Sequence, residues 1–262
     1  MSFLAIAGLI YLALMGYAYF SADGMIFLPP HPSYDDGTPF IKIPTAGGTA
    51  VAALHLPCPG ADYTILFSHG NGEDLGSVRE ELPRYCEEGF SVIAYDYSGY
   101  GRSTGRPSEA AAYLDIDAVC DYLIREIRVP PERIILQGRS VGSGPSIDLA
   151  ARRTVGGLIL ESPFVSAFRV LTHVPIFPID KFENIKKIGS VSCPVLVIHG
   201  KRDSIVPFWH GETLYRKAQG PKMNYWVEGA DHNDLKFVAG EEYWKVLDRF
   251  RRLIAGQGEA NR

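Results

Sequence analysis

Ser140 stands in a pattern that is typical of a catalytic nucleophile. Residues 138–142 read Gly-Arg-Ser-Val-Gly, and they follow the apolar run Ile134–Gln137 and precede a helical pattern that contains Ile147, Leu149, Ala150 and Ala151. A sharp strand-to-helix turn strains its central residue, and glycines on both sides leave room for it. The pattern predicts that the Ser140 hydroxyl stands at the C-terminal edge of a sheet and attacks a carbonyl. The Val141 N–H, at a helix N-terminus, then points at the oxyanion.

A serine hydroxyl needs a neighbouring base to act as a nucleophile. The predicted base is His232, because it lies in a loop of small and polar residues after the last apolar run. The predicted acid, which orients the imidazole, is Asp203, just beyond the apolar run Val195–His199. Three carboxylates remain as rival acids, namely Glu161, Asp231 and Asp234. The other histidines in apolar surroundings, His69, His199 and His210, are expected to be structural or lining residues.

A second donor to the oxyanion is expected from the loop Phe67–Gly72, which reads Phe-Ser-His-Gly-Asn-Gly. Glycines let the backbone approach a substrate closely. The N–H of Asn71, or that of Gly72, would pair with the N–H of Val141, and the alternative is a plain glycine turn. A further glycine-rich stretch, Asp96–Ser103, lacks phosphate-loop spacing and is interpreted as a structural turn in which Asp96 bonds nearby backbone.

Short apolar runs bounded by glycine or proline predict eight strands, several of them buried on both faces. They are Phe40–Ile43, Val51–Leu56, Tyr63–Ser68, Ser91–Tyr95, Arg133–Gln137, Gly157–Leu160, Val195–His199 and Lys222–Val227. Amphipathic stretches alternate with the later strands, so we expect an α/β fold whose sheet is mainly parallel, has an antiparallel start and carries helices on both faces.

One predicted helix begins after Ser108, whose side chain can cap it. The expected inward positions are Leu114, Ile116, Val119, Leu123 and Ile127, and the expected outward positions are Asp115, Asp117, Asp121 and Arg125.

The longest break in this alternation is the segment 163–194, which places aromatic residues among prolines. It is interpreted as a cap over the top of the sheet. Phe164, Phe168 and Phe177, together with Gly72, are candidate substrate-binding residues for an acyl chain. The alternative is a cap that is simply packed.

The chain begins with a hydrophobic segment, residues 1–22, in which no Lys, Arg, Asp or Glu occurs before Asp23. As a helix, Phe3–Phe20 would be about 27 Å long, close to the hydrocarbon thickness of a bilayer. A membrane anchor is favoured over a cleaved signal peptide and over a buried helix, and the side of the membrane stays open. A linker is expected at 23–37 and the catalytic domain at 38–262, so a chain without residues 1–22 is expected to stay active.

Composition excludes several classes of function. The chain has 26 Lys and Arg against 30 Asp and Glu, a net charge of −4, so it carries no basic footprint for nucleic acid. Four cysteines in 262 residues are too few for a disulfide scaffold, and no C-x-x-C pair suggests zinc. No metal or organic cofactor is expected.

Four long stretches resemble the α/β-hydrolase superfamily. They are Phe67–Gly76, Tyr95–Glu109, Pro194–Val206 and Trp226–Leu235, and the similarity runs from about residue 38 to the C-terminus. Within the superfamily, the sequence looks like the serine hydrolases grouped with Bem-type proteins and the protein depalmitoylases of the ABHD class. The resemblance implies Ser140, Asp203 and His232 as a catalytic triad, in the chain order of α/β-hydrolases, and hydrolysis of acyl esters or thioesters.

One departure from the depalmitoylases bears on the substrate. They carry a cysteine-rich, lipid-modified N-terminus, whereas the first cysteine here is Cys58 and the hydrophobic segment takes its place. The sequence therefore predicts a membrane-associated serine hydrolase that cleaves carboxylic esters or thioesters of a lipid or a lipidated protein. Alternatives are a protein S-depalmitoylase, a serine peptidase and a non-catalytic hydrolase fold that binds a ligand.

Overall fold

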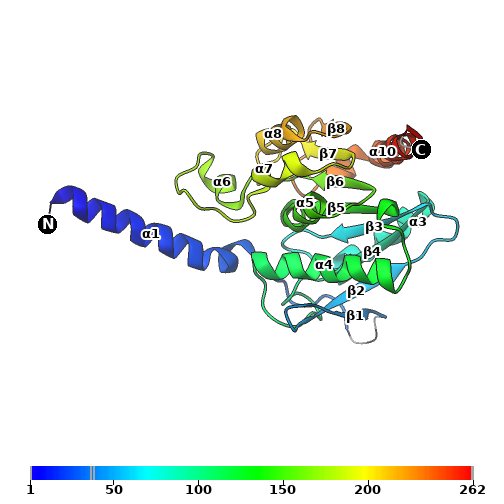
Figure 1. Cartoon of the computed structure of the whole chain (residues 1–262), viewed down its shortest axis with the longest axis horizontal. Coiled ribbons are helices and arrows are strands. Elements are labelled where there is room, and N and C mark those ends of the chain that lie inside the picture. The colour runs from blue at the N-terminus through cyan, green and yellow to red at the C-terminus, as the bar shows by residue number, and fades with distance from the viewer. Residues whose placement is uncertain (1, 36, 38, 261–262) are drawn as a thin grey trace.

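A single sheet organises the fold in the computed structural model, which describes residues 2–35, 37 and 39–260. In that part of the chain the sheet has eight strands in the order β1-β2-β4-β3-β5-β6-β7-β8 (Figure 1). The strands are β1 (Ile41–Pro44), β2 (Ala50–Leu56), β3 (Tyr63–Ser68), β4 (Phe90–Tyr95), β5 (Ile134–Arg139), β6 (Gly157–Glu161), β7 (Val195–Gly200) and β8 (Lys222–Val227). The predicted boundary between linker and domain, at Thr38, lies outside the described residues.

The strand directions agree with the sequence pattern. The antiparallel pairs are β1 with β2 and β2 with β4, and every pairing from β4 through β3 to β8 is parallel. Successive residues of β3 serve opposite faces: Ile65 and Phe67 pack in one core cluster and Leu66 in the other. Because both faces of the central strands are covered, their sequences are continuous apolar runs rather than alternating ones.

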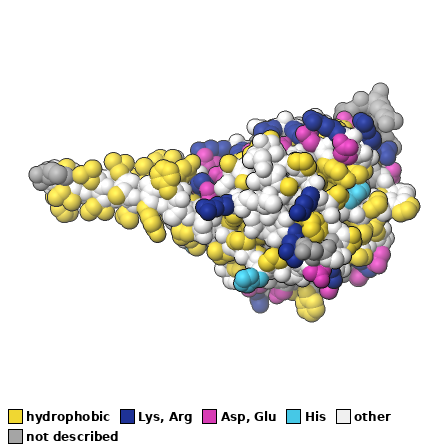
Figure 2. Space-filling view, turned by 90° about the horizontal axis from the view of Figure 1, so that it is seen from below, with side chains coloured by type: hydrophobic (Ala, Val, Ile, Leu, Met, Phe, Trp, Pro, Cys, Tyr) yellow, Lys and Arg dark blue, Asp and Glu magenta, His cyan; other side chains and the backbone are white. Residues whose placement is uncertain are grey.

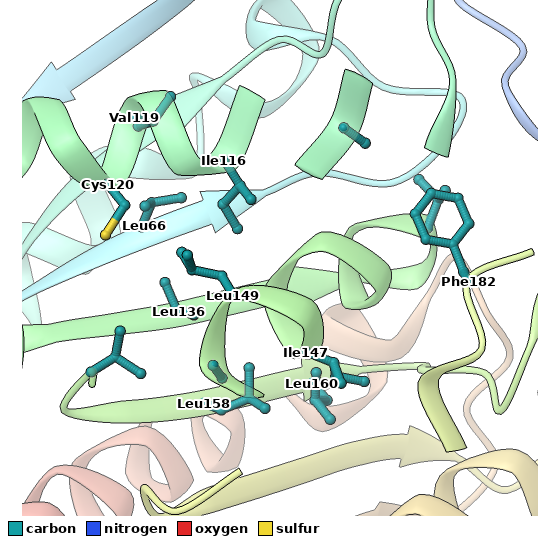
Figure 3. Packing of buried hydrophobic residues seen from close by; sticks show 14 of the residues in the cluster. Leu66, Ile116, Val119, Cys120, Leu136, Ile147, Leu149, Leu158, Leu160 and Phe182 are labelled. Atoms are coloured by element: carbon teal, nitrogen blue, oxygen red, sulfur yellow. The ribbon is translucent and has the colours of Figure 1, made fainter. Parts of the chain in front are cut away.

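Helices cover both faces of the sheet, as predicted. Their bounds are α1 (Phe3–Ile26), α2 (Leu75–Val78), α3 (Leu82–Glu87), α4 (Glu109–Arg125), α5 (Ser143–Arg152), α6 (Ala167–Thr172), α7 (Asn184–Lys187), α8 (Trp209–Lys217), α9 (Leu235–Ala239) and α10 (Glu241–Ala260), with 3₁₀ turns η1 (Pro131–Arg133), η2 (Ser140–Gly142) and η3 (Ile188–Ser190). On one face, Ile116 of α4 and Leu149 of α5 pack on Leu66 and its neighbours (Figure 3). On the other, Tyr85 of α3 packs on Phe67, and Phe250 of α10 belongs to the same cluster.

Helix α4 begins where Ser108 predicts it, since the Ser108 side chain accepts a hydrogen bond from the Ala111 N–H. The expectation that Asp115 faces solvent is wrong, because this residue is fully buried. Its two carboxylate oxygens accept hydrogen bonds from the N–H and the hydroxyl of Ser98, at 2.7 and 2.8 Å. Leu114 and Ile127, both predicted to face the core, are instead 37% exposed.

Helix α1 projects away from the domain, and hydrophobic side chains cover its visible surface (Figures 1 and 2). Its 24 residues are long and apolar enough, by length and composition, to cross a membrane. The helix ends at Ile26, four residues beyond the predicted boundary, so a deletion of residues 1–22 would cut inside it.

The stretch predicted as a linker, residues 23–37, is packed against the domain where the structure describes it. Phe27 and Tyr34 are 3% and 6% exposed. The Tyr34 hydroxyl donates to Asp96, and the Ser33 N–H donates to Asp74 at 2.6 Å. These contacts fix the end of α1 to the domain.

A disulfide joins Cys58, after β2, to Cys86 of α3, with Cα atoms 5.5 Å apart. The sequence pattern gives no sign of this pairing. The other two cysteines, Cys120 and Cys193, are buried free thiols.

The predicted cap connects β6 to β7 and contains α6, α7 and η3. Its two ends are built into the core, where Phe164 packs against Phe182 at a ring distance of 6.2 Å. Its middle part, α6 and the turn that follows, extends beyond the sheet on the same side as α1 (Figure 1).

Candidate active site

The turn at the end of β5 has the strained conformation that the G-x-S-x-G pattern predicts. Ser140 has φ +52°, a left-handed conformation that is uncommon for a residue with a side chain. A Cβ atom at Gly138 would meet the Gly142 carbonyl oxygen, and one at Gly142 would meet the Ser68 carbonyl oxygen. Both flanking positions therefore require glycine, and the turn leaves the Ser140 side chain at the carboxyl end of the sheet.

Three predicted residues from separate loops meet at this turn. His232 Nε2 lies 3.1 Å from the Ser140 hydroxyl oxygen, and His232 Nδ1 lies 2.8 Å from Asp203 Oδ2. A hydroxyl, an imidazole and a carboxylate in this order are the groups with which a serine can attack a carbonyl. Asp203 follows β7 and His232 follows β8, so parallel strands bring both side chains to the same edge of the sheet as Ser140.

Asp203 is held by more than His232. Its other oxygen, Oδ1, accepts the N–H groups of Ile205 and Val206 at 3.1 and 2.7 Å. His199 Nε2 lies 3.2 Å from Oδ2. Burial would raise the pKa of the Asp203 carboxyl, but the hydrogen bonds from His199 and His232 outweigh it and hold this pKa well below its usual range.

The rival acids lie in other hydrogen-bond networks. Glu161 is buried and accepts the Tyr243 hydroxyl at 2.7 Å. Asp231 accepts the N–H of Ser204 at 2.7 Å, and Asp234 accepts the N–H of Asp231. The hydrogen bonds of the described residues therefore connect only Asp203 to the imidazole of His232.

The loop after β3 lies beside Ser140 and presents backbone donors. Among the described residues, the Asn71 N–H, which lies outside helices and strands, is not used in a hydrogen bond within the chain. The Asn71 side chain is fixed, because its Oδ1 accepts the Leu28 N–H at 2.8 Å and the Tyr100 hydroxyl at 2.7 Å. Leu28, the second residue after α1, thus contacts the loop that the sequence predicts as part of the oxyanion site.

A cleft of about 720 Å³ opens at Ser140 and His232. Its lining residues, grouped along the chain, are Gly70, Asn71, Gly72, Glu73, Glu81, Arg139, Ser140, Glu161, Ser162, Ile205, His232, Asn233, Leu235, Lys236 and Phe237. Gly72 is here, as predicted. The three predicted cap residues are not: Phe164 is in the core, and Phe168 and Phe177 face each other at a ring distance of 6.4 Å in the cap.

The floor of the cleft is a charge network that the sequence reasoning missed. Arg139 Nη1 pairs with Glu73 at 2.6 Å, Nη2 with Glu81 at 2.9 Å, and Nε lies 3.4 Å from Glu161. Lys236 pairs with Glu81 at 3.1 Å. The only sign of this network in the sequence is Arg139, which occupies a variable position of the G-x-S-x-G motif. The motif accepts any residue there, so it does not predict the ion pairs.

This network also supports the loop that carries Asn71. Glu73 Oε2 accepts the Gly70 N–H at 2.5 Å, so one carboxylate joins the loop after β3 to Arg139 at the end of β5. Burial would raise the pKa of Glu73, but the Arg139 guanidinium, the nearby His69 and the hydrogen bond from the Gly70 N–H together outweigh it and lower this pKa. Within residues 2–35, 37 and 39–260, no group of His, Cys, Asp or Glu side chains is arranged to hold a metal ion.

Comparison with known proteins agrees with this fold. A family model described as serine aminopeptidase, S33, matches residues 59–178, a range that includes Ser140 and ends before Asp203 and His232. The alpha/beta hydrolase domain-containing protein 17B of Xenopus laevis is 40% identical over 215 residues, which is 80% of this chain and 73% of the relative. The chain belongs to the α/β-hydrolase domain-containing protein 17 family. Its human relative of the same name is 39% identical, with the same coverage of both chains.

The solved structures similar to this family member show the fold. The Pyrococcus furiosus esterase Pf2001 superposes with a TM-score of 0.72 over 86% of this chain and 98% of the esterase, at 20% identity. The expected eight-stranded α/β-hydrolase architecture, preceded by an apolar helix, is therefore confirmed.

Proposed function

We propose that this α/β-hydrolase is a membrane-associated serine hydrolase that cleaves carboxylic esters or thioesters through an acyl-enzyme. The observation that carries the proposal is the continuous line of hydrogen-bonding groups from Asp203 through His232 to Ser140, at 2.8 and 3.1 Å. Family membership supports hydrolysis, and the cleft beside Ser140 supplies the space for a substrate.

The proposed mechanism has two halves. In the first, Ser140 attacks the acyl carbonyl while His232 takes the hydroxyl proton, and the alcohol or thiol leaves with that proton. In the second, water takes the place of the leaving group, His232 removes its proton, and the acid is released. The N–H groups of Asn71 and Val141 hold the oxyanion in both halves, and each such donor contributes about 3–4 kcal/mol in the transition state.

The N-terminal helix supports a substrate at a membrane surface. If α1 crosses a bilayer, its end lies at the membrane boundary, and Leu28, two residues further on, contacts Asn71. Two large apolar side chains lie exposed at the cleft, Phe237 at 90% and Ile205 at 50%. An acyl group that is presented from a bilayer would reach Ser140 across this rim.

A protein S-depalmitoylase is the narrower form of this proposal. The resemblance of the sequence to depalmitoylases supports it, and a thioester meets the same chemical requirements as an ester. An aminopeptidase is less favoured, because the cleft carboxylates that would bind a substrate ammonium are already paired with a cation. Glu73, Glu81 and Glu161 are each paired with Arg139.

Covalent labelling tests the nucleophile. A fluorophosphonate probe is expected to label the full-length protein in detergent and to leave Ser140→Ala unlabelled, with turnover reduced by about 10⁶. Ser190→Ala, which changes an exposed serine away from the cleft, is the matched control and should label normally. Equal labelling of the Ser140→Ala protein would overturn the assignment.

The substrate class requires a separate measurement. Oxygen esters and matched thioesters with acyl chains from C2 to C16 are compared with and without detergent micelles, alongside an aminoacyl anilide. We expect turnover to rise with chain length and with micelles. A steep preference for C2–C4, or faster cleavage of the anilide, would contradict the long-chain acyl substrate.

A further inference from the structure

The middle of the cap is an exposed apolar turn. Residues 170–179, here called the cap turn, read Val-Leu-Thr-His-Val-Pro-Ile-Phe-Pro-Ile, without Lys, Arg, Asp or Glu. Leu171, Val174 and Ile176 are 75%, 59% and 52% exposed. Several large apolar side chains exposed together on one turn indicate a surface that contacts another apolar phase.

The cap turn contacts α1 far from the point where the helix joins the domain. The Tyr11 hydroxyl donates to the Ile176 carbonyl oxygen at 2.8 Å, and the Tyr11 and Phe177 rings are 5.6 Å apart. Figure 1 shows the loop after α6 reaching along α1 beyond the body of the domain.

This contact fixes the depth of the turn if α1 crosses a bilayer. Tyr11 lies about 22 Å along the helix axis from Ile26, at about 1.5 Å per residue. The whole helix is about 36 Å long and the hydrocarbon about 30 Å thick, so at most about 6 Å of the helix stands outside. Tyr11 is then at least about 16 Å below the boundary nearest the domain. A tyrosine side chain reaches about 6 Å and its hydrogen bond to Ile176 adds 2.8 Å. For a helix along the bilayer normal, the Ile176 carbonyl oxygen is therefore at least about 7 Å deep.

Several carbonyl groups of the cap turn have hydrogen-bond partners within the chain, which lowers the cost of placing the turn where water is scarce. The Thr172 hydroxyl donates to the Val174 carbonyl at 2.7 Å, and Arg169 donates to the His173 carbonyl at 3.2 Å. Tyr11 satisfies the Ile176 carbonyl, and Pro175 and Pro178 have no N–H to satisfy.

Polar residues lie where the boundary between hydrocarbon and water is expected, near the end of α1 that joins the domain. Lys181, just after the cap turn, pairs with Asp23 at 3.3 Å and lies 4.5 Å from the centre of the Tyr19 ring. Lysine and tyrosine are the residues that occupy the interface between hydrocarbon and water. Lys181, after the cap turn, and Asp23, near the end of α1, therefore lie at the same depth relative to the bilayer.

We propose that the cap turn inserts into the hydrocarbon of the lipid bilayer beside α1, as a second membrane contact of the domain. This inference rests on the proposed membrane helix. A single helix leaves the domain free to rotate about the helix axis, whereas two insertions fix which side of the domain faces the membrane. The cleft at Ser140 would then keep one orientation towards acyl groups in the bilayer.

Spin labels on introduced cysteines test the depth of the turn in full-length protein reconstituted in phosphatidylcholine vesicles. The labelled variants are Val174→Cys in the cap turn, Leu9→Cys on α1 and Glu126→Cys on the exposed end of α4. We expect the labels at positions 174 and 9 to be reached by oxygen and protected from a water-soluble nickel complex. The label at position 126 should show the reverse.

The three labels separate the inference from the function on which it rests. If position 9 is in hydrocarbon and position 174 is in water, the inserted cap turn is refuted and the membrane helix stands. If position 9 is in water, the membrane helix is refuted, and the inserted turn with it.

Activity gives a second readout that does not depend on labelling. A Val174→Asp, Ile176→Asp variant should keep its turnover of a soluble short-chain ester but lose about tenfold or more on an ester embedded in vesicles, because a carboxylate in hydrocarbon is strongly disfavoured. Ile127→Asp, at an exposed position on the opposite part of the domain, is the control and should change neither. Unchanged turnover of the embedded ester by the double variant would contradict the proposal.

Discussion

Replacement of Phe27 by alanine tests whether the end of α1 belongs to the folded domain. The Phe27 side chain is 3% exposed, and its ring lies 6.3 Å from Tyr97, 6.3 Å from Tyr100 and 5.9 Å from Phe182. These partners come from the loop after β4 and from the cap, so Phe27 joins parts of the fold that are distant in sequence. Its removal should leave a cavity under the exit of α1.

The size of the effect follows from this burial. A buried phenylalanine changed to alanine typically costs 3–5 kcal/mol, which includes the lost transfer free energy and the cavity. We therefore expect Phe27→Ala to lower the free energy of unfolding by about 4 kcal/mol. In a domain of this size that corresponds to a fall in Tm of about 8–16 °C. Turnover should also be reduced at temperatures where the variant is still folded, because Leu28 then holds Asn71 less firmly.

Urea unfolding of the full chain in detergent, followed by near-UV circular dichroism, measures the change. The matched control is Phe20→Ala, because Phe20 lies on α1, seven residues before Phe27, and is 86% exposed. The control should stay within about 0.5 kcal/mol of the parent. If both variants unfold at the same urea concentration as the parent, Phe27 is not part of the core and the reasoning fails.

Three further predictions concern single carboxylates. Asp203→Asn should lower kcat about 10⁴-fold on a short-chain ester, because His232 loses the partner that orients its ring. Glu73→Ala should lower kcat about tenfold or more with little change in KM, because Gly70 and the donor loop lose their support; the exposed Glu80→Ala is its control. Burial raises the pKa of Asp115 to about 6 despite the hydrogen bonds from Ser98. The folded state therefore holds this proton more tightly than the unfolded state, and the stability of the parent relative to Asp115→Asn should fall by about 2.4 kcal/mol between pH 4 and pH 7 in urea titrations.

Each of these has a result that would count against it. Retention of more than a tenth of kcat in Asp203→Asn would mean that another acid orients His232. Equal kcat for Glu73→Ala and Glu80→Ala would mean that the loop needs no support from Arg139. A stability difference that does not change with pH would show that Asp115 titrates normally.

The sheet was predictable because its signal is local. Strands β3 to β7 are short apolar runs between glycines and prolines, and burial on both faces makes those runs continuous. Asp115 shows the limit of such patterns. Its partner, Ser98, is 17 residues away in a loop, and a helical wheel assigns a carboxylate to solvent when no partner is visible. The wrong prediction that Leu114 is buried has the same cause, because the predicted orientation of α4 about its axis was incorrect.

The residues around the candidate site were predictable to different degrees, again according to how local their sequence signal is. Ser140, Asp203 and His232 each follow a recognisable strand, so parallel topology predicts that they meet, although their catalytic role stays a prediction. The charge network around Arg139 draws on β5, β6, α9 and the loop after β3, and no spacing rule connects those elements. The aromatic residues of the cap were assigned to the substrate by composition alone, and the structure places them away from the cleft.

The ion pair between Asp23 and Lys181 also has a consequence for folding during synthesis. Its partners are 158 residues apart, and ribosomes add about 5–20 residues per second. About 8–32 s therefore pass between the synthesis of Asp23 and that of Lys181. Throughout this interval the last turn of α1 and Phe27 have no cap to pack against. Helix α1 is thus made before the domain but is among the last elements to be completed, and the nascent chain must protect the apolar residues at the end of α1 from aggregation until the cap is synthesised.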